Sequence, residues 1–497
     1  MPGPDQLTRV SSVKTVAAFR AHLQSLGVGL DCDEVVLRPK DSPLARAVDA
    51  VQLNGKKIGN RYAIQPMEGW DATAHGGTTA DVIRRWHRFG LSGAKLICGG
   101  EAMAVRPDGR ANPNQLIIDE RNKSDLARLR ETLVTSHRER HGTTDDLVVG
   151  FQLTHSGRFC KPNDKTRLEP RVAYRHPILD RKFGVTSDSQ VFTDGEIEAL
   201  IEDYIRAARI AYDVGADFVD IKHCHGYLLH EFLSAFHRRG KFGGSFENRT
   251  RILREIVEGI RGDGNPIELA VRLSTFDLVP FKPDPARSRA GKPGPGIPEE
   301  YSQLLPYDYA FGVNPHNPTV PNLDEAARFL DLCAELGIKL VNLTAGSPYY
   351  NPHIQRPAAY PPSDGYQPPE DPLVGVARQI DAVRQLRARA SRNLILVGSA
   401  YSYLQEFLVH VAQHAVGAGW VDIVGIGRMV LSYPEVFSDA LSGGQLNPKL
   451  LCRTFSDCTT APRNGLISGC YPLDKHYTEK PEGRLLKEIK KGLGGNQ

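Results

Sequence analysis

The feature that most constrains this chain is an alternation, repeated eight times, between a short apolar segment and a longer amphipathic one. The apolar segments are rich in β-branched residues and span 61–67, 94–101, 147–155, 217–222, 268–274, 338–346, 393–399 and 421–428. The amphipathic segments that follow them span 80–93, 123–140, 194–215, 247–262, 322–337, 375–390, 403–416 and 434–441. Near-continuous apolar runs are typical of parallel strands covered on both faces. Eight strand–helix units therefore predict an α/β fold, a (β/α)8 TIM barrel.

A doubly wound parallel sheet is the alternative fold. A nucleotide-binding fold of that kind has a glycine-rich phosphate turn after the first strand, and the stretch PMEGWDATAHGG does not supply one. The pattern divides the chain into an N-terminal extension (1–50), a barrel (51–445) and a C-terminal tail that contains cysteines (446–497). One helix is expected in the extension.

Two long proline-rich segments, 279–321 and 347–371, follow the fifth and sixth predicted strands. Both therefore leave the C-terminal face of the barrel, where active sites of this fold lie. Long irregular loops are uncommon and are usually functional or disordered. We expect 347–371, which contains Tyr349, Tyr350, His353 and Arg356, to be a substrate lid. The alternative is a surface loop that covers the edge of the barrel.

Composition excludes several classes of function. The chain has 62 basic and 58 acidic residues, a net charge of +4, so a nucleic acid or a membrane surface is not an expected partner. No apolar run is long enough to cross a membrane, and the N-terminus lacks the apolar core of a signal peptide. Eight cysteines in 497 residues do not indicate a disulfide scaffold, so we expect a cytoplasmic protein with a small-molecule substrate. Whether it forms a homo-oligomer stays open.

Polar and small residues gather where the predicted strands end. They are Pro66, Met67, Glu68, Glu101, Ala102, Gln152, His155, Lys222, His225, Tyr227, Arg272, Gly398, Gly427 and Arg428. In a barrel these positions meet at one face. Glycine-rich ends on the last two strands, with an arginine beside them, are typical of a phosphate site.

Several motifs occur in order along 50–445: NRYAIQPM, LICGGEAMAVRPDGR, GFQLTHSGR, GADFVDIKHCHGYLLHEFLS, FGGSFENRTRILREIVEGIR, AVRLS and GIGRMVLSYPE. Through them the chain resembles the Old Yellow Enzyme family of FMN-dependent NAD(P)H:flavin oxidoreductases, including its 2,4-dienoyl-CoA reductase branch. The pairing of HGYLLHEFLS with GGSFENR is the most specific part of the likeness.

The resemblance implies a cofactor site for FMN. Backbone at Pro66 and Met67, together with Ala102, would border the isoalloxazine ring. Gln152 would bind the pyrimidine edge, and Arg272 would lie by N1 and the C2 carbonyl.

The resemblance also places the phosphate and the reacting groups. Gly398, Gly427 and Arg428 would hold the FMN phosphate. Tyr227 would give a proton to the substrate carbon, and His225 would bind the activating oxygen of the substrate.

Two positions depart from the family pattern. Lys222 stands where a histidine is usual, and Glu68 stands near the flavin where a small threonine or cysteine is usual. A buried lysine can have a lowered pKa and act as an acid or base, or it can pair with Glu68.

The leading functional prediction is NAD(P)H-dependent reduction of an activated C=C bond. The two departures favour an alternative, oxidation or demethylation of an amine, as in relatives similar to trimethylamine dehydrogenase. A third hypothesis is a flavin-binding protein without turnover, such as an electron-transfer partner.

The tail contains Cys452, Cys458 and Cys470. The dienoyl-CoA reductase branch has four cysteines for a [4Fe–4S] cluster in this region, and one of the four is missing here. Cluster ligation normally requires four thiolates, although Asp457 could supply a fourth ligand. Zinc or a purely structural role are the alternatives. Few residues follow Cys470, so we expect no second flavin domain, and electrons would come from NAD(P)H, a protein partner or the substrate.

Overall fold

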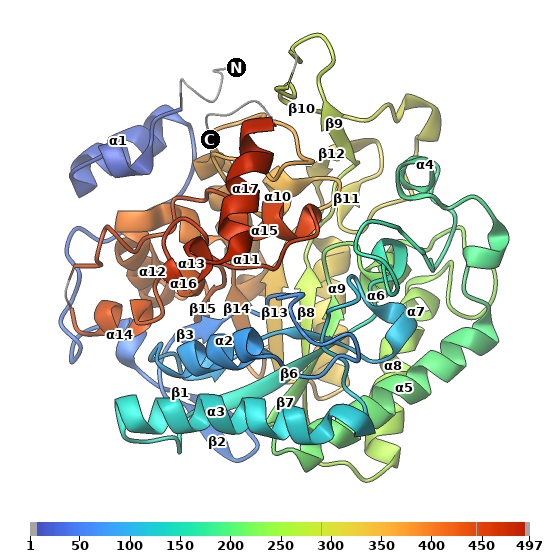
Figure 1. Cartoon of the computed structure of the whole chain (residues 1–497), viewed down its shortest axis with the longest axis horizontal. Helices are drawn as coiled ribbons and strands as arrows, with labels where there is room; N and C mark the ends of the chain where they lie inside the picture. Colours follow the sequence, from blue (N-terminus) through green and yellow to red (C-terminus); the bar gives the residue numbers. More distant parts are fainter. Residues whose placement is uncertain (1–6, 290, 444, 493–497) are drawn as a thin grey trace.

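The computed structural model describes residues 7–289, 291–443 and 445–492. In this part of the chain eight parallel strands form the wall of a barrel (Figure 1). They are β3 (Tyr62–Ile64), β4 (Leu96–Ile97), β6 (Val148–Thr154), β7 (Phe218–His223), β8 (Glu268–Ser274), β13 (Leu340–Thr344), β14 (Ile395–Gly398) and β15 (Ile423–Ile426). All eight predicted strands are confirmed.

The barrel closes where its last strand pairs with its first. Val424 of β15 lies opposite Tyr62 of β3, and Ile426 lies opposite Ile64. A short additional strand, β5 (Ala102–Ala104), continues beside the end of β6 and pairs Ala102 with Gln152. The wall strands are almost wholly buried, because the outer helices cover one face and the barrel interior the other.

The outer helices surround this wall (Figure 1). They are α2 (Ala80–Gly90), α3 (Lys123–His141), α5 (Asp194–Asp213), α8 (Arg251–Gly262), α9 (Asp324–Glu335), α11 (Pro372–Arg389), α12 (Leu408–Gly417) and α14 (Val436–Leu441). Side-chain caps fix the residues at which several of these helices begin. In α5, Glu196 N donates to Thr193 Oγ1 at 3.2 Å and Thr193 N donates to Glu196 Oε2 at 2.8 Å, a reciprocal capping box.

Two predicted helices are interrupted. The segment 247–262 divides into α7 (Phe246–Arg249) and α8, which meet at Thr250. The segment 403–416 begins as a 3-10 helix, η9 (Tyr401–Phe407), and continues as α12. Gln405 in η9 has φ 49° and ψ −110°, which no helix tolerates. Periodicity alone does not reveal such local breaks.

The N-terminal extension packs against the barrel. Its expected helix is α1 (Val16–Ser25), and Phe19 stacks on Phe407 with ring centroids 4.1 Å apart. The hairpin of β1 (Val48–Leu53) and β2 (Lys56–Ile58) buries Leu53 and Ile58 in an apolar cluster with the N-terminal residues of the wall strands. The hairpin therefore lies at one end of the barrel, away from the long loops (Figure 1).

The long segments at the other end are more regular than proline content suggests. The segment 279–321 forms two antiparallel hairpins, β9 (Phe281–Pro283) with β10 (Gly296–Pro298) and β11 (Val313–Asn314) with β12 (Asn317–Pro321). The remaining short helices lie in loops or in the tail. They are α4 (Leu179–Phe183), α6 (Leu228–Leu233), α10 (Pro352–Gln355), α13 (Met429–Ser432), α15 (Asp457–Arg463), α16 (Lys475–Thr478) and α17 (Pro481–Gly492). In the described ranges no helix has the length and apolar character of a membrane-spanning segment.

Candidate active site

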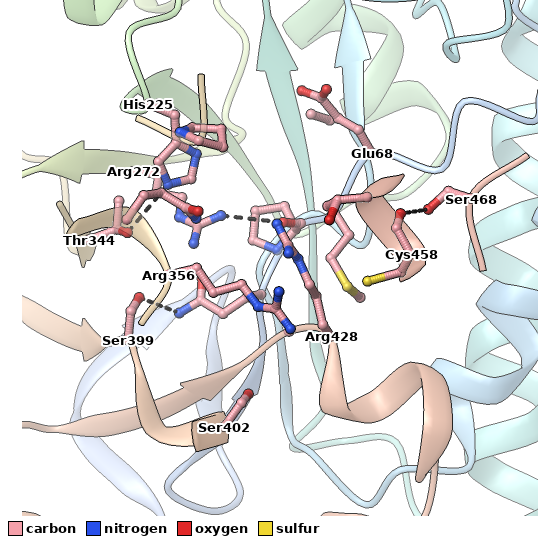
Figure 2. Close-up of a pocket in the computed structure, with 18 of the residues that line it drawn as sticks. Glu68, His225, Arg272, Thr344, Arg356, Ser399, Ser402, Arg428, Cys458 and Ser468 are labelled. Carbon is pink, nitrogen blue, oxygen red and sulfur yellow. Dashed lines mark hydrogen bonds between the residues drawn. The ribbon is translucent and has the colours of Figure 1, made fainter. Parts of the chain in front are cut away.

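A cavity of about 200 Å³ opens at the C-terminal ends of the barrel strands (Figure 2). Most residues predicted for the site line it: Pro66, Met67, Glu68, Ala102, Gln152, Lys222, His225, Tyr227, Arg272, Gly427 and Arg428. Gly398 ends β14 and is not among the lining residues, but the next two residues, Ser399 and Ala400, are. The structure therefore brings the strand ends to one place, as a barrel requires.

Gln152 on β6 is held by a buried carboxylate. Its Nε2 donates to Asp220 Oδ2 at 2.8 Å, so its carbonyl oxygen remains for the cavity. Burial raises the pKa of Asp220 to about 6, although the bond from Gln152 and the charge of Arg272 act against this. Arg272 is itself 6% exposed, and its Nε has no hydrogen-bond partner among the described residues. The guanidinium also donates from Nη1 to Pro66 O at 3.3 Å, so an acceptor and a cation meet at this side of the cavity.

Two further arginines, Arg356 and Arg428, line the cavity. Figure 2 shows Arg356 beside Arg428, which follows β15. Among the described residues no ion pair joins either arginine to a carboxylate, whereas Arg463 pairs with Asp364 at 2.6 Å. Burial and repulsion from Arg356 lower the pKa of Arg428 to about 9. Uncompensated guanidinium groups beside the backbone of Gly427 fit a phosphate.

The turn after β7 aims the catalytic candidates into the cavity. His225 has φ 66° and Gly226 has φ 76°, two consecutive left-handed residues that reverse the chain into α6. Such a conformation is strained for histidine and is frequent at functional sites. His225 Nε2 shares a hydrogen bond of 3.3 Å with Thr344 Oγ1 at the end of β13. Burial lowers the pKa of His225 well below its usual value, and the charges of Arg272 and Lys222 lower it further.

Glu68 is the centre of a buried hydrogen-bond cluster. Lys222 Nζ lies 2.7 Å from Glu68 Oε1, in an ion pair whose side chains are 4% and 12% exposed. Tyr227 Oη donates to Glu68 Oε2 at 2.8 Å, and Trp70 Nε1 donates to the same oxygen at 3.1 Å. The Lys222 ammonium also lies 3.4 Å from the centroid of the Tyr227 ring, and Tyr349 Oη is 3.0 Å from Tyr227 Oη. The ion pair expected between the two departures from the family pattern is therefore present.

The cluster keeps Tyr227 protonated. Burial raises the pKa of the Tyr227 phenol well above its usual value, and the negative charge of Glu68 raises it further. A protonated phenol with a fixed position can act as a general acid.

Sequence reasoning missed several lining residues. Trp70 and Arg463 lie outside the predicted strands and loops of interest, and no periodicity singles them out. Thr344 and Ser399 do end predicted strands and could have been found by the same rule as their neighbours. Tyr349, from the expected lid segment 347–371, does line the cavity.

His155 and Arg158 at the end of β6 are not among the residues that line this cavity. Arg158 is 1% exposed and donates to Glu231 Oε1 at 2.8 Å and Asp180 Oδ1 at 2.5 Å. This buried network ties α6 to the loop that contains α4. Arg158 is therefore a support for the turn after β7.

Cys452, Cys458 and Cys470 are the tail cysteines for which the resemblance suggested a cluster. In the described ranges no group of three or more His, Cys, Asp or Glu residues is arranged to hold an ion. Cys458 lines the cavity, but Cys452 Sγ accepts a hydrogen bond from Thr454 N, and Asp457 pairs with Lys490 at 2.9 Å. The charges of Cys452 and Cys458 act on the Cys470 thiol, so the three cysteines lie near one another, but the described residues do not show the iron–sulfur site that the resemblance suggested.

The polar groups of the cavity instead fit FMN. The Gln152 oxygen and the Arg272 guanidinium suit a pyrimidine edge, and the arginine pair suits a terminal phosphate.

Comparison with known proteins agrees with this fit. Residues 50–286 match the NADH:flavin oxidoreductase / NADH oxidase family. The chain is 29% identical over 249 residues to an NADH:flavin oxidoreductase of Gibberella zeae, with 46% of this chain and 57% of that protein covered. It is 30% identical over 239 residues to an NADPH dehydrogenase of Geobacillus sp., with coverage of 46% and 63%. The chain thus spans less than two thirds of the length of these relatives.

Solved structures share the fold. A 2-naphthoyl-CoA reductase superposes with a TM-score of 0.62 at 18% identity, covering 88% of this chain and 57% of that one. Old Yellow Enzyme from Pichia sp. superposes with a TM-score of 0.56 at 18% identity, covering 88% and 96%. Over residues 50–286 the chain is therefore similar to the NADH:flavin oxidoreductase / NADH oxidase family, and it shares its barrel fold with the Old Yellow Enzyme of Pichia sp..

Proposed function

We propose that the protein is an FMN-dependent oxidoreductase that transfers hydride between NAD(P)H and a small organic molecule, and that it reduces an activated C=C bond. One observation supports this above the others. One cavity is lined by the Gln152 acceptor, the Arg272 guanidinium, two arginines without a carboxylate partner, and a protonated tyrosine.

The residues that would hold the flavin ring come from four strands. Pro66, Met67 and Ala102 present backbone and apolar side chains to the cavity. Gln152 can accept from the pyrimidine N–H, because its own amide N–H group is engaged by Asp220. The Arg272 guanidinium can stabilise negative charge at that edge. FMN would supply the hydride-transfer chemistry between the nicotinamide and the substrate.

The phosphate would be held at the ends of β14 and β15. Arg428 and Arg356 provide charge-assisted donors, and Gly427 allows close approach of backbone. Gly398 would act by positioning the turn into Ser399 rather than by facing the cavity.

The substrate would be polarised and protonated by residues of β7 and the following turn. Lys222 and His225 can donate to its activating oxygen, and Tyr227 can give a proton to its carbon. Each of these three is buried, so water competes little for the same groups.

Amine oxidation or demethylation is the second candidate, because Glu68 and Lys222 replace the residues usual in ene-reductases. A flavin protein without turnover is the third. All eight cysteines are free thiols, which supports our proposal of a reducing, cytoplasmic setting.

Anaerobic half-reactions separate the candidates. The FMN-loaded protein should be reduced by NADPH or NADH and reoxidised by an enone such as cyclohexenone. Reduction by a methylated amine, with little response to NAD(P)H, would support amine oxidation instead. A bound flavin that is reduced neither by NAD(P)H nor by the amine would support the third hypothesis, a flavin protein without turnover.

A further inference from the structure

We propose that Glu68 sets the charge selectivity of the substrate site: it neutralises Lys222, so that the site rejects anions such as carboxylates and admits neutral acceptors. This inference rests on the proposed function, because it assumes that the substrate binds beside Lys222 and Tyr227. Glu68 would act as a specificity-determining residue.

The hydrogen-bond inventory of Glu68 is the first support. Its Oε1 accepts from Lys222 at 2.7 Å, and its Oε2 accepts from Tyr227 at 2.8 Å and from Trp70 at 3.1 Å. Both oxygens are therefore occupied by donors of the protein. A substrate ammonium beside Glu68 would face the Lys222 cation.

The balance of charge is the second support. The charged groups that line the cavity are Lys222 on β7, Glu68 after β3, Arg272 on β8 and three further arginines: Arg356 and Arg428, which we assign to the phosphate, and Arg463, which pairs with Asp364. Arg272 lies at the edge assigned to the pyrimidine, which leaves Lys222 and Glu68 to cancel each other. His225 adds no charge at neutral pH, since its pKa is lowered well below its usual value by burial.

A substrate carboxylate would therefore meet a lysine whose positive charge is already balanced by Glu68. The substrate carboxylate would have to lie beside the buried negative charge of Glu68, or break the ion pair between Lys222 and Glu68. Either event costs free energy, because both groups are buried. A neutral carbonyl avoids both costs. The Lys222 ammonium has three N–H groups and gives only one short hydrogen bond to Glu68, so another N–H group can donate to the carbonyl oxygen.

The segment around Glu68 is fixed, so the carboxylate cannot easily turn away. Gly69 N donates to Glu101 Oε2 at 3.2 Å, and Arg85 binds Glu101 at 2.6 Å as well as Asp71. Trp70 has φ 52°, a left-handed conformation that holds its indole toward Glu68. Glu68 is thus built into the site.

The test uses benzoate and its neutral counterpart benzamide as probes. Calorimetric titration of the FMN-loaded wild type should show benzamide binding at least about tenfold more tightly than benzoate. In Glu68→Gln the preference should invert, with benzoate tightened at least about tenfold and benzamide changed far less. In the double variant Glu68→Gln/Lys222→Met, benzoate should again bind weakly, because the freed cation is gone.

The matched control is Glu268→Gln. Glu268 pairs with Lys339 at 2.6 Å where β8 begins, at the other end of the barrel. This change removes the same charge and should leave both probes unaffected. Equal binding of benzoate and benzamide to wild type overturns the inference even if Glu68→Gln fails to fold. Failure of folded Glu68→Gln to bind benzoate overturns it as well.

Flavin retention separates this inference from the proposed function. A wild-type protein that takes up no FMN refutes the proposed function. An FMN-loaded protein that is reduced by NAD(P)H, yet shows no change of probe preference, refutes only the role of Glu68.

Discussion

The side-chain amide of Gln152 donates a 2.8 Å hydrogen bond to the carboxylate of Asp220, and both residues are 1% exposed. The bond decides which end of the Gln152 amide faces the cavity. Because the N–H group is turned to Asp220, the cavity receives an acceptor. Asp220, which does not line the cavity, thus determines which group Gln152 presents to the cavity.

Replacing Asp220 by alanine should therefore weaken FMN binding. The Gln152 amide loses its anchor and can present either end to the ligand, a loss of about tenfold in affinity for one misplaced hydrogen bond. Fluorescence titration of apoprotein with FMN measures it. Asp220→Asn keeps an acceptor for Gln152 and should bind FMN nearly as well as wild type. Equal affinity in Asp220→Ala and wild type would remove Asp220 from this role.

The same carboxylate predicts a pH dependence of stability. Burial raises the folded-state pKa of Asp220 to about 6 from an ordinary value of 3.8, so the folded protein holds the extra proton between these values. The free energy of unfolding should fall as pH rises through this window, with a contribution of about 3 kcal/mol at most from this group. Asp220→Asn should flatten the dependence in urea unfolding at pH 4 and pH 6.

Asp277 is the matched control for that experiment. Its pKa is also raised to about 6 by burial, but it binds Tyr350 and Asn351 and does not line the cavity. Asp277→Asn should flatten the pH dependence in the same sense and leave FMN affinity unchanged. Loss of FMN from Asp277→Asn would show that the two effects are not separable.

The arginine pair predicts a phosphate contribution to cofactor binding. Arg428→Met or Arg356→Met should weaken FMN by about 10- to 100-fold, the loss expected when a charge-assisted contact disappears. Riboflavin, which lacks the phosphate, should bind the variants and the wild type alike. Arg384→Met removes an exposed arginine paired with Asp381 and serves as control. A riboflavin affinity that falls in parallel with FMN would contradict the assignment.

Tyr227→Phe should separate the two half-reactions. Reduction of bound flavin by NAD(P)H should be nearly unchanged, whereas reoxidation by an enone should slow by about 100-fold or more, the usual contribution of a general acid. Stopped-flow absorbance under anaerobic conditions measures both rates. Tyr204→Phe removes a buried hydroxyl on α5 and should alter neither. Unchanged reoxidation in Tyr227→Phe would exclude it as proton donor.

The barrel could be read from the sequence because each wall strand is a continuous apolar run bounded by helical segments. Strand β7 shows why the site could be read as well. Its apolar residues end at Ile221, so Lys222 and the turn that follows must meet the other strand ends. The ion pair between Lys222 and Glu68 was one of two alternatives for Lys222, and the structure contains it.

Other parts could not be predicted. The hairpins β9–β10 and β11–β12 depend on pairing between proline-rich segments whose residues show no alternation. Trp70 reaches Glu68 only because it adopts a left-handed backbone conformation, which favours glycine and is not expected of tryptophan. The resemblance suggested a cluster at the tail cysteines, but spacing along the chain does not fix the arrangement of thiols in space, and the described residues show no group arranged to hold an ion.

The visible absorption spectrum of the purified protein, before and after anaerobic addition of NAD(P)H, tests the central claim most directly. We expect flavin bands that bleach when NAD(P)H is added, and a flavin that is released as FMN when the protein is denatured. A colourless protein that takes up no FMN on reconstitution would contradict it.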